Sequence, residues 1–275
     1  MAPIVPAPVV PAPEQLRRRY GLFDAAAGPL DLPAHGEGGG VRFTPLACGG
    51  SYAYGVSCYE PGAAPAKPLD GGNAEVSTGV FAVLSTLLCG SVGYSDEEFR
   101  TQVRRRLEGS EMAGVERALW GGDDFEGNAL EILTLSDEAE NIPAGYDPGL
   151  ITDVVGALER YAYTVQGYGG VAYLHAPIEV AAFAAEAGLV LPETSGPTGR
   201  KITPMGSIWA FGAYPAGSII VTGQTTVWRA PEIQVYNSFD QNTNEVLMVA
   251  ERAYSVAFEC FAGEAEFDPL EVTSP

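Results

Sequence analysis

The segment Ser95–Trp120, SDEEFRTQVRRRLEGSEMAGVERALW, organises the 275-residue chain around it. Ser95 and Glu98 form a capping-box pattern, and the acidic first turn suits the positive end of a helix dipole. Gly121-Gly122 follows as a stop signal. Apolar residues recur at helical spacing: Phe99, Val103, Leu107, Val115 and Leu119. The pattern predicts one helix roughly 40 Å long, and periodicity alone favours an ordinary core helix over a specialised one.

The composition limits the partners that the chain can bind. Its formal charge is −20 and its pI is near 4.3, which argues against broad electrostatic binding of nucleic acid or anionic membrane. No run of about 18 apolar residues occurs, so we expect no membrane span. The N-terminal MAPIVPAPVVPAP is broken by proline and lacks the positive region of a signal peptide. We therefore expect a bacterial cytoplasm, or a particle assembled in one.

Four cysteines are present, and none belongs to a C-x-x-C pair: Cys48, Cys58, Cys89 and Cys260. The chain is not a small secreted scaffold, so buried free thiols are favoured over disulfides. A zinc site is not expected, because His35 and His175 have no cysteine nearby in the sequence.

The N-terminal half is rich in extended segments. Residues 1–13 form a proline-alanine arm, which is either a free tail or an arm that docks on a neighbour. Residues 41–88 predict a long hairpin with a Pro/Gly-rich tip and no helix of its own. A hairpin of this kind rarely stabilises itself, so it must lie on the body of the chain or on another subunit.

The C-terminal half predicts an α/β subdomain and a long final strand. A second helix is expected from Asp147-Pro148 to Gly167, then the strand VAYLHA, then a third helix opened by Pro177. The segment NEVLMVAERAYSVAFECF alternates between two faces and is the longest strand signal in the chain.

No motif names a reaction. The chain has no G-x-S-x-G elbow or phosphate-binding loop, and the GxGG turn at 167–170 follows a helix, where dinucleotide binding needs a strand. His175 fits a core histidine satisfied by backbone better than a catalytic one. The acidic pairs in loops fit solvated charge better than a two-carboxylate hydrolase. Trp209 and Trp228 fit core or interface positions better than a sugar groove.

The order of elements resembles the major capsid proteins of tailed bacteriophages, the Hong Kong 97-type fold that encapsulin shells share. The segment AERAYSVAFECFAGEAEF is similar to the common ending of such chains. ALERYAYTVQGYGGVAYLHAPIEVAAFAAEAGLV, with TGQTTVWRA after it, resembles actinobacterial phage head proteins. The resemblance covers most of the chain and implies an α+β fold with an N-terminal arm, an E-loop hairpin, a peripheral (P) domain with a spine helix and long β-strands, and an α/β axial (A) domain.

The resemblance also implies boundaries and contact residues. The segments are the N-terminal arm at 1–40, the E-loop hairpin and lead-in strand at 41–94, the spine helix at 95–128, the A-domain at 129–230, and the P-domain closing strands with the C-terminal tail at 231–275. Candidate subunit-contact residues are Lys67, Arg104, Arg105, Arg106 and Arg252. One branch of the family joins a hairpin lysine to a neighbour's asparagine, but nothing near Lys67 suggests the carboxylate that this reaction needs.

The implied function is structural and not enzymatic, without cofactor or metal. Hexameric and pentameric capsomers would close into an icosahedral virion head around double-stranded DNA, without sequence-specific binding and without a membrane. Scaffold, decoration and portal proteins are the expected partners, and the scaffold would be a separate protein or absent. Three alternatives remain: an encapsulin-like shell, another phage structural part such as a tail or decoration protein, and a carbohydrate-active enzyme.

Overall fold

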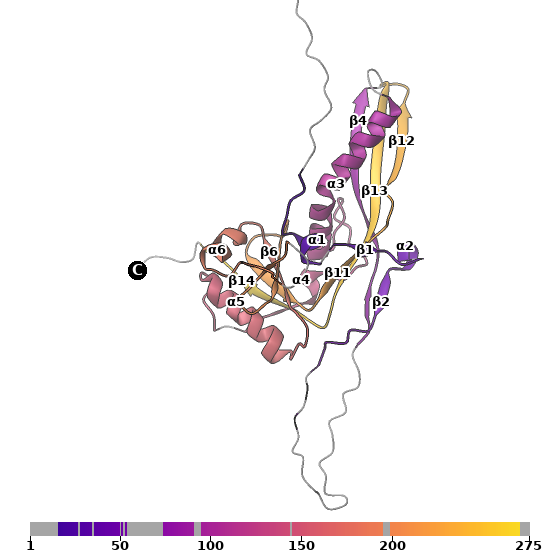
Figure 1. Ribbon diagram of the computed structural model, residues 1–275. Coiled ribbons are helices and arrows are strands. Elements are labelled where there is room, and N and C mark those ends of the chain that lie inside the picture. The colour runs from indigo at the N-terminus through magenta and orange to yellow at the C-terminus, as the bar shows by residue number, and fades with distance from the viewer. Residues whose placement is uncertain are drawn as a thin grey trace, which may run out of the picture.

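The computed structural model describes residues 16–26, 28–34, 36–49, 51, 53, 74–90, 95–143, 145–194 and 199–269. Its helices and strands form an α+β fold with three sheets (Figure 1). One end of the molecule is an elongated layer in which α3 lies along β4, β12 and β13. The other end is a lobe that contains α5, α6, β6 and β14.

Helix α3 (Asp96–Gly121) confirms the long helix predicted from the sequence. The Ser95 side chain accepts a hydrogen bond from the Glu98 backbone, and the Glu98 carboxylate accepts one from the Ser95 backbone. Gly122 ends the helix in the left-handed conformation, with φ of 69°. The buried face contains the expected apolar residues together with Ala118 and two glutamates that periodicity did not single out, Glu111 and Glu116.

A five-stranded sheet carries the long closing strand. Its members are β1 (Leu30–Asp31), β4 (Phe81–Gly90), β11 (Thr225–Arg229), β12 (Gln234–Asp240) and β13 (Glu245–Phe258). Strand β13 pairs with β4 along one edge and with β12 and then β11 along the other. The predicted long strand is therefore correct. Helix α3 covers one face of this sheet through a small core that includes Val103, Leu107 and Met248.

The seven-stranded sheet forms the lobe. In spatial order it contains β5 (Ala139–Asn141), β14 (Ala262–Glu266), β10 (Ser218–Thr222), β6 (Tyr173–Pro177), β9 (Ile208–Gly212), β8 (Lys201–Ile202) and β7 (Leu191–Pro192). Helix α5 (Ile151–Arg160), its π-helical continuation η1 (Tyr161–Val165) and α6 (Val180–Glu186) flank it. The largest hydrophobic core lies between these helices and the sheet.

Two predicted helix starts are wrong by a few residues. The second helix begins at Ile151, because Asp147 forms a turn in which its carboxylate accepts from Gly149 and its carbonyl from Leu150. Pro177 ends strand β6, and α6 begins only at Val180. In both places the helix begins three residues after the proline.

The predicted returning arm of the hairpin is two separate strands. Strand β3 (Val76–Thr78) pairs with β2 (Val41–Phe43), whereas β4 joins the five-stranded sheet. Gly79 allows the break, because a Cβ there would lie 2.1 Å from the Glu131 carbonyl oxygen. The tip of the predicted hairpin, with Lys67 and Cys58, lies outside the described residues.

The expectation of free thiols is wrong for two cysteines. Cys48 and Cys260 form a disulfide across 212 residues of sequence, with their Cα atoms 5.3 Å apart. Cys48 lies beyond β2, and Cys260 lies in the turn between β13 and β14. Only the folded arrangement of these segments brings the two residues within bonding distance.

The remaining short elements are α1 (Leu22–Ala25), α2 (Gly36–Gly39) and α4 (Leu135–Glu138). Of these, α1 and α4 contact α3. Strand pairing also crosses the segment boundaries predicted from the sequence. Strand β11 lies within 129–230 and pairs in the five-stranded sheet, while β14 lies within 231–275 and pairs in the seven-stranded sheet.

Candidate assembly site on the long helix

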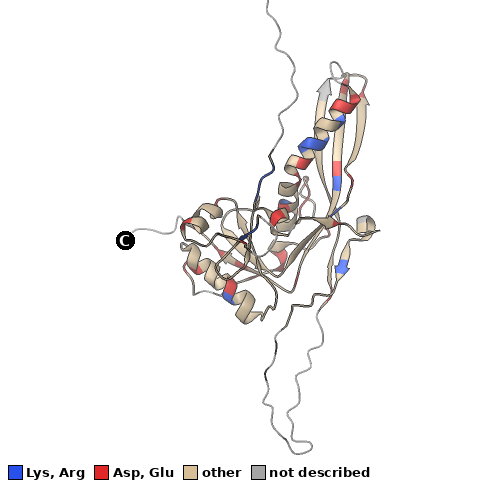
Figure 2. Cartoon of the chain, viewed as in Figure 1, with Lys and Arg blue, Asp and Glu red and all other residues tan. Residues whose placement is uncertain are grey.

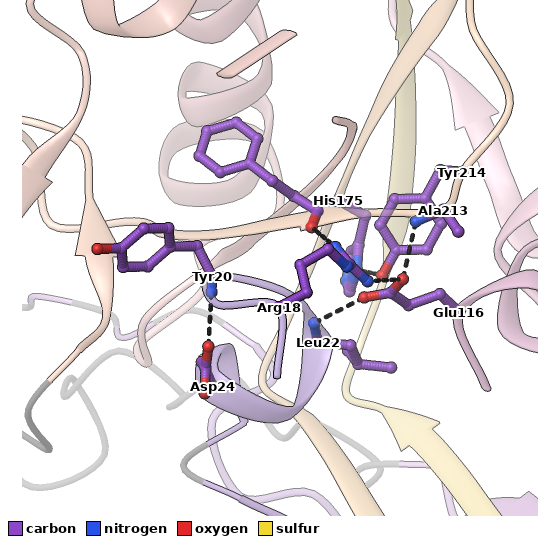
Figure 3. A network of polar contacts seen from close by, with 9 residues as sticks. Arg18, Tyr20, Leu22, Asp24, Glu116, His175, Ala213 and Tyr214 are labelled. Atoms are coloured by element: carbon purple, nitrogen blue, oxygen red, sulfur yellow. Dashed lines mark hydrogen bonds and ion pairs between the residues drawn. The ribbon is translucent and has the colours of Figure 1, made fainter. Parts of the chain in front are cut away.

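Glu116 of α3 joins three separate segments of the chain (Figure 3). Its side chain is fully buried and forms an ion pair with Arg18. The same carboxylate accepts hydrogen bonds from the backbone N–H of Leu22 at 3.1 Å and from that of Ala213 at 2.8 Å. Glu116 thereby fixes the first described residues of the N-terminal segment and the turn after β9 to the helix.

Arg18 strengthens this junction from the other side. Its Nη1 donates to the Phe211 carbonyl oxygen at 2.6 Å, while the side chain remains about one-third exposed. The Phe211 backbone N–H in turn donates to the Tyr20 carbonyl oxygen at 2.8 Å. Residues 18–22 are therefore held on both α3 and β9, which are parts of different layers.

Glu111 lies about one and a half turns before Glu116 on α3 and connects the helix to the five-stranded sheet. Arg229 of β11 and Arg252 of β13 each approach its carboxylate to 3.1 Å, and the Tyr254 hydroxyl donates to the same group. Glu111 is almost completely buried. Two guanidinium groups and a hydroxyl supply the charge and donors that a buried carboxylate requires.

Burial sets the ionisation behaviour of these groups. It raises the pKa of Glu116, whereas Arg18 and the two backbone N–H groups act in the opposite direction. Burial, with the Glu111 carboxylate next in importance, raises the pKa of Tyr254. Burial raises the pKa of Tyr214 well above its ordinary value. These tyrosines therefore act as neutral hydrogen-bonding groups.

His175 is a core residue, as the sequence favoured, but side chains rather than backbone satisfy it. Its Nδ1 lies 3.2 Å from the Tyr214 hydroxyl, and its Nε2 lies 3.0 Å from the Thr222 hydroxyl and 3.2 Å from that of Thr225. The ring is completely buried, and burial lowers its pKa to about 3. A neutral, enclosed imidazole of this kind holds β6, β10 and β11 together.

The predicted subunit-contact residues lie in different settings. Arg104 and Arg105 are exposed on α3, and Arg106 is also exposed but donates to the Thr86 carbonyl oxygen at 3.0 Å. Arg252 is turned inward to Glu111. Lys67 lies outside the described residues. Figure 2 shows basic and acidic residues interspersed on α3, and basic residues on the chain leading to α1.

The face of the five-stranded sheet opposite α3 carries exposed apolar side chains. Side chains alternate along a strand, so Leu247 points away from the buried Met248 beside it. Leu247 pairs with Leu88 of β4, and Glu251 pairs with Leu84. The exposed fractions are 38% for Leu247, 61% for Leu88, 42% for Leu84 and 49% for Tyr236. We call these four residues the open sheet face.

A hollow of about 650 Å³ adjoins this region. It lies between α3, β4 and residues 213–215, and its lining includes Trp120, Phe125 and Tyr214. Phe125 is largely exposed beside it. Apolar surface therefore extends along the elongated layer and its junction with the lobe, where a neighbouring molecule could bury it.

Among the described residues, the acidic pairs and Trp209 that the sequence offered as catalytic or sugar-binding candidates have structural contacts of their own. Asp124 organises its own turn by accepting from the backbone of Glu126 and Asn128. Trp209 is fully buried and donates to the Leu189 carbonyl oxygen, so it cannot form a sugar platform. Across the described ranges, no three His, Cys, Asp or Glu side chains are grouped to hold a metal ion. The search of those same ranges finds no helix with the length and apolarity needed to cross a bilayer.

These features define a phage capsid fold, with one long helix on a long-stranded sheet and an α/β lobe beside it. The chain is similar to the capsid of a native GTA particle, with a TM-score of 0.56 and 11% identity over 96% of this chain and 95% of the other. A structure from Mycobacterium phage Ogopogo matches with a TM-score of 0.56 and 15% identity over 96% and 97% of the two chains.

A third structure, from Mycobacterium phage Adephagia, has a TM-score of 0.55 and 14% identity over 95% of this chain and 93% of the other. No protein-family model matches the chain, and a search of curated proteins finds no significant relative. The fold is therefore shared over nearly the whole length, while the sequences have diverged almost completely.

Proposed function

We propose that this protein is the major capsid subunit of a phage head. Copies would form hexamers and pentamers that close into an icosahedral shell around double-stranded DNA. The observation that carries the proposal is the structural match of 96% of the chain to the capsid of a native GTA particle. The open sheet face supports it, because this apolar surface is uncovered in a single chain.

The assembly mechanism is the burial of apolar surface between copies. Each 100 Å² of apolar area removed from water contributes about 2.5 kcal/mol. The part of the predicted hairpin that connects β2 and β3, residues 44–75 of one subunit, is our candidate for covering the open sheet face of the next. Helix α3, fixed to the sheet by Glu111 and to the lobe by Glu116, keeps the surface in a constant shape.

Charge suits the proposed contents of the shell. A net charge of −20 disfavours tight binding to phosphate, so packaged DNA would remain free to leave. Arg104 and Arg105 are exposed cations on an acidic chain and are candidates for pairing with a neighbour's carboxylates. Scaffold, decoration and portal proteins remain proposed partners, and assembly in the host cytoplasm remains a proposed setting.

Assembly can be tested with Leu88→Glu. A charged side chain on the open sheet face should prevent particle formation without unfolding the subunit, because Leu88 is already 61% exposed. The measurements are negative-stain microscopy, size exclusion and circular dichroism of wild type and variant. Leu191→Glu, at a leucine in β7 that is 41% exposed, is the control and should assemble. A wild-type chain that stays monomeric would refute the proposal.

An encapsulin-like shell is the second candidate, because the capsid fold alone does not distinguish it. Particles containing protein cargo and no DNA would favour it. A tail or decoration protein would form tubes or rings, or would bind to existing heads. The carbohydrate-active alternative loses its main residue, since Trp209 is fully buried and stacks on Phe211.

A further inference from the structure

The Cys48–Cys260 disulfide lies at the junction of three parts of the molecule. Cys48 follows β2 at the start of the predicted hairpin. Cys260 lies between β13 of the five-stranded sheet and β14 of the seven-stranded sheet. One covalent bond therefore joins the base of the hairpin to the point where the chain passes from one sheet to the other.

The Cys260 side of this bond is held by many contacts. Phe261 packs edge-on against Tyr161 and Tyr168, with ring centroids 5.8 and 5.4 Å apart. The Tyr168 hydroxyl donates to the Glu259 carboxylate at 3.2 Å, and the Glu259 backbone N–H donates to the Gln224 carbonyl oxygen at 3.1 Å. Cys260 therefore lies in a well-packed turn at the edge of the lobe.

The Cys48 side is held more weakly. The Ala47 carbonyl oxygen accepts from the Gly169 N–H at 3.1 Å, and Ala47 packs against the edge of the lobe core. Leu46 is almost fully exposed beside it. Without the disulfide, few contacts would keep residues 46–49 on the lobe, so this bond decides whether the hairpin base is anchored.

The two bonded cysteines lie at the surface of the molecule. Cys260 is exposed and Cys48 is half-buried, so we expect a thiol or a low-molecular-weight disulfide to reach the bond. Thiols in a bacterial cytoplasm are kept reduced, whereas disulfides persist after release from it. The redox state of this pair would therefore change between the place of assembly and the outside of the cell.

We propose that Cys48 and Cys260 form a redox-controlled clip for the base of the predicted hairpin. This inference rests on the proposed capsid function. In the reduced state residues 46–49 are free to adjust while the hairpin docks on a neighbour. After assembly, a low-molecular-weight disulfide such as oxidised glutathione closes the clip and fixes the hairpin base to the lobe.

The chemistry balances without a cofactor. One cysteine loses its proton and attacks the external disulfide, forming a mixed disulfide and releasing one small thiolate. The second cysteine, also deprotonated, attacks the mixed disulfide at the protein sulfur and releases the second small thiolate. The protein pair loses two electrons, the external disulfide gains two, and the two released thiolates take up the two protons.

The test compares particles purified with dithiothreitol before and after treatment with oxidised glutathione. Free thiols are alkylated with a maleimide under denaturing conditions and located by peptide mass spectrometry. We expect Cys48 and Cys260 to lose labelling together, while Cys58 and Cys89 remain labelled. The oxidised particles should melt several degrees higher than the reduced ones.

Variants separate the clip from general cysteine effects. The double variant Cys48→Ser/Cys260→Ser should assemble normally and melt like reduced wild type under both conditions. Cys89→Ser should retain the redox-dependent shift. The clip is refuted if the double variant fails to assemble, if the pair resists both reduction and oxidation, or if closing it leaves the melting temperature unchanged.

The same labelling also applies to unassembled subunits, which keeps the two proposals distinguishable. If wild type forms no particles, the capsid function fails, and labelling of the soluble chain still shows whether the pair opens and closes. If particles form and labelling shows no redox change, only the clip fails.

Discussion

Replacing Glu116 by alanine tests whether this buried carboxylate fixes the N-terminal segment to the body of the molecule. The substitution removes the acceptor for the Leu22 and Ala213 backbone N–H groups and the partner of Arg18. Both N–H groups would then face a cavity left by the deleted side chain. Arg18 keeps its bond to the Phe211 carbonyl oxygen and can turn toward water, because it is about one-third exposed.

The loss of stability in Glu116→Ala can be calculated from the hydrogen bonds that the substitution removes. A buried donor left without its acceptor costs roughly 1–3 kcal/mol, and two donors lose theirs here. We expect the variant to be less stable by about 3 kcal/mol, within the range measured when a buried ion pair loses one member. The local opening that frees residues 17–22 would then be populated about a hundred times more often.

Trypsin provides a local assay, because Arg17, Arg18 and Arg19 are consecutive cleavage sites beside the network. When opening is fast relative to cleavage, the cleavage rate follows the population of the open form. We expect cleavage at these residues to be about two orders of magnitude faster in Glu116→Ala. Glu108→Ala, which removes an exposed carboxylate of the same helix, should leave the rate within about a factor of two of wild type.

The outcome that would refute this reasoning is an unchanged cleavage rate in a folded Glu116→Ala subunit. A companion variant, Arg18→Ala, leaves the buried carboxylate without its counter-charge. Burial already raises the pKa of Glu116, so loss of Arg18 should raise it further. A folded-state pKa above the unfolded value means that stability falls as pH rises, so the variant should lose more stability at pH 8 than at pH 5.

Acid should destabilise the lobe through His175. The unfolded chain binds a proton near pH 6.5, whereas burial lowers the folded pKa to about 3, so stability falls as pH drops from 6.5 toward 3. At pH 5 this group lowers the free energy of unfolding by about 2 kcal/mol. Urea unfolding at pH 5 and at neutral pH should show the difference, and His175→Gln should remove this part of the pH dependence of stability. Ser95→Ala should lower the free energy of unfolding by about 1 kcal/mol through loss of the helix cap. Thr101→Ala on the same helix is its comparison, and equal effects of the two would contradict the capping argument.

Short sequence patterns were enough to predict α3 and β13. The capping pair Ser95 and Glu98, with Gly122 at the other end, fixed the limits of α3 to within one residue. Alternation of polar and apolar residues was enough to identify β13. The family resemblance assigned both elements to the same domain, which neither pattern shows.

Capping and periodicity patterns cannot predict contacts between residues that are far apart in the sequence. Glu111 and Glu116 resemble any surface glutamate in the sequence. Their burial is tolerable because distant segments bring three arginines and further hydrogen-bond donors to them. Acidic residues at positions that match the apolar spacing of α3 were the one available clue. The Cys48–Cys260 bond and the break at Gly79 likewise depend on which distant segments meet.

Strand β13 has a mechanical consequence. Its 14 residues extend for roughly 45 Å and continue, after only three residues, into β14 of the lobe. Its hydrogen bonds to β4 and β12 lie across the direction of the chain. Tension pulling the two ends of the molecule apart would therefore load these bonds in shear, all at the same time, instead of unzipping them singly. A wall built from such ribbons would resist stretching along β13 far better than peeling at its edges.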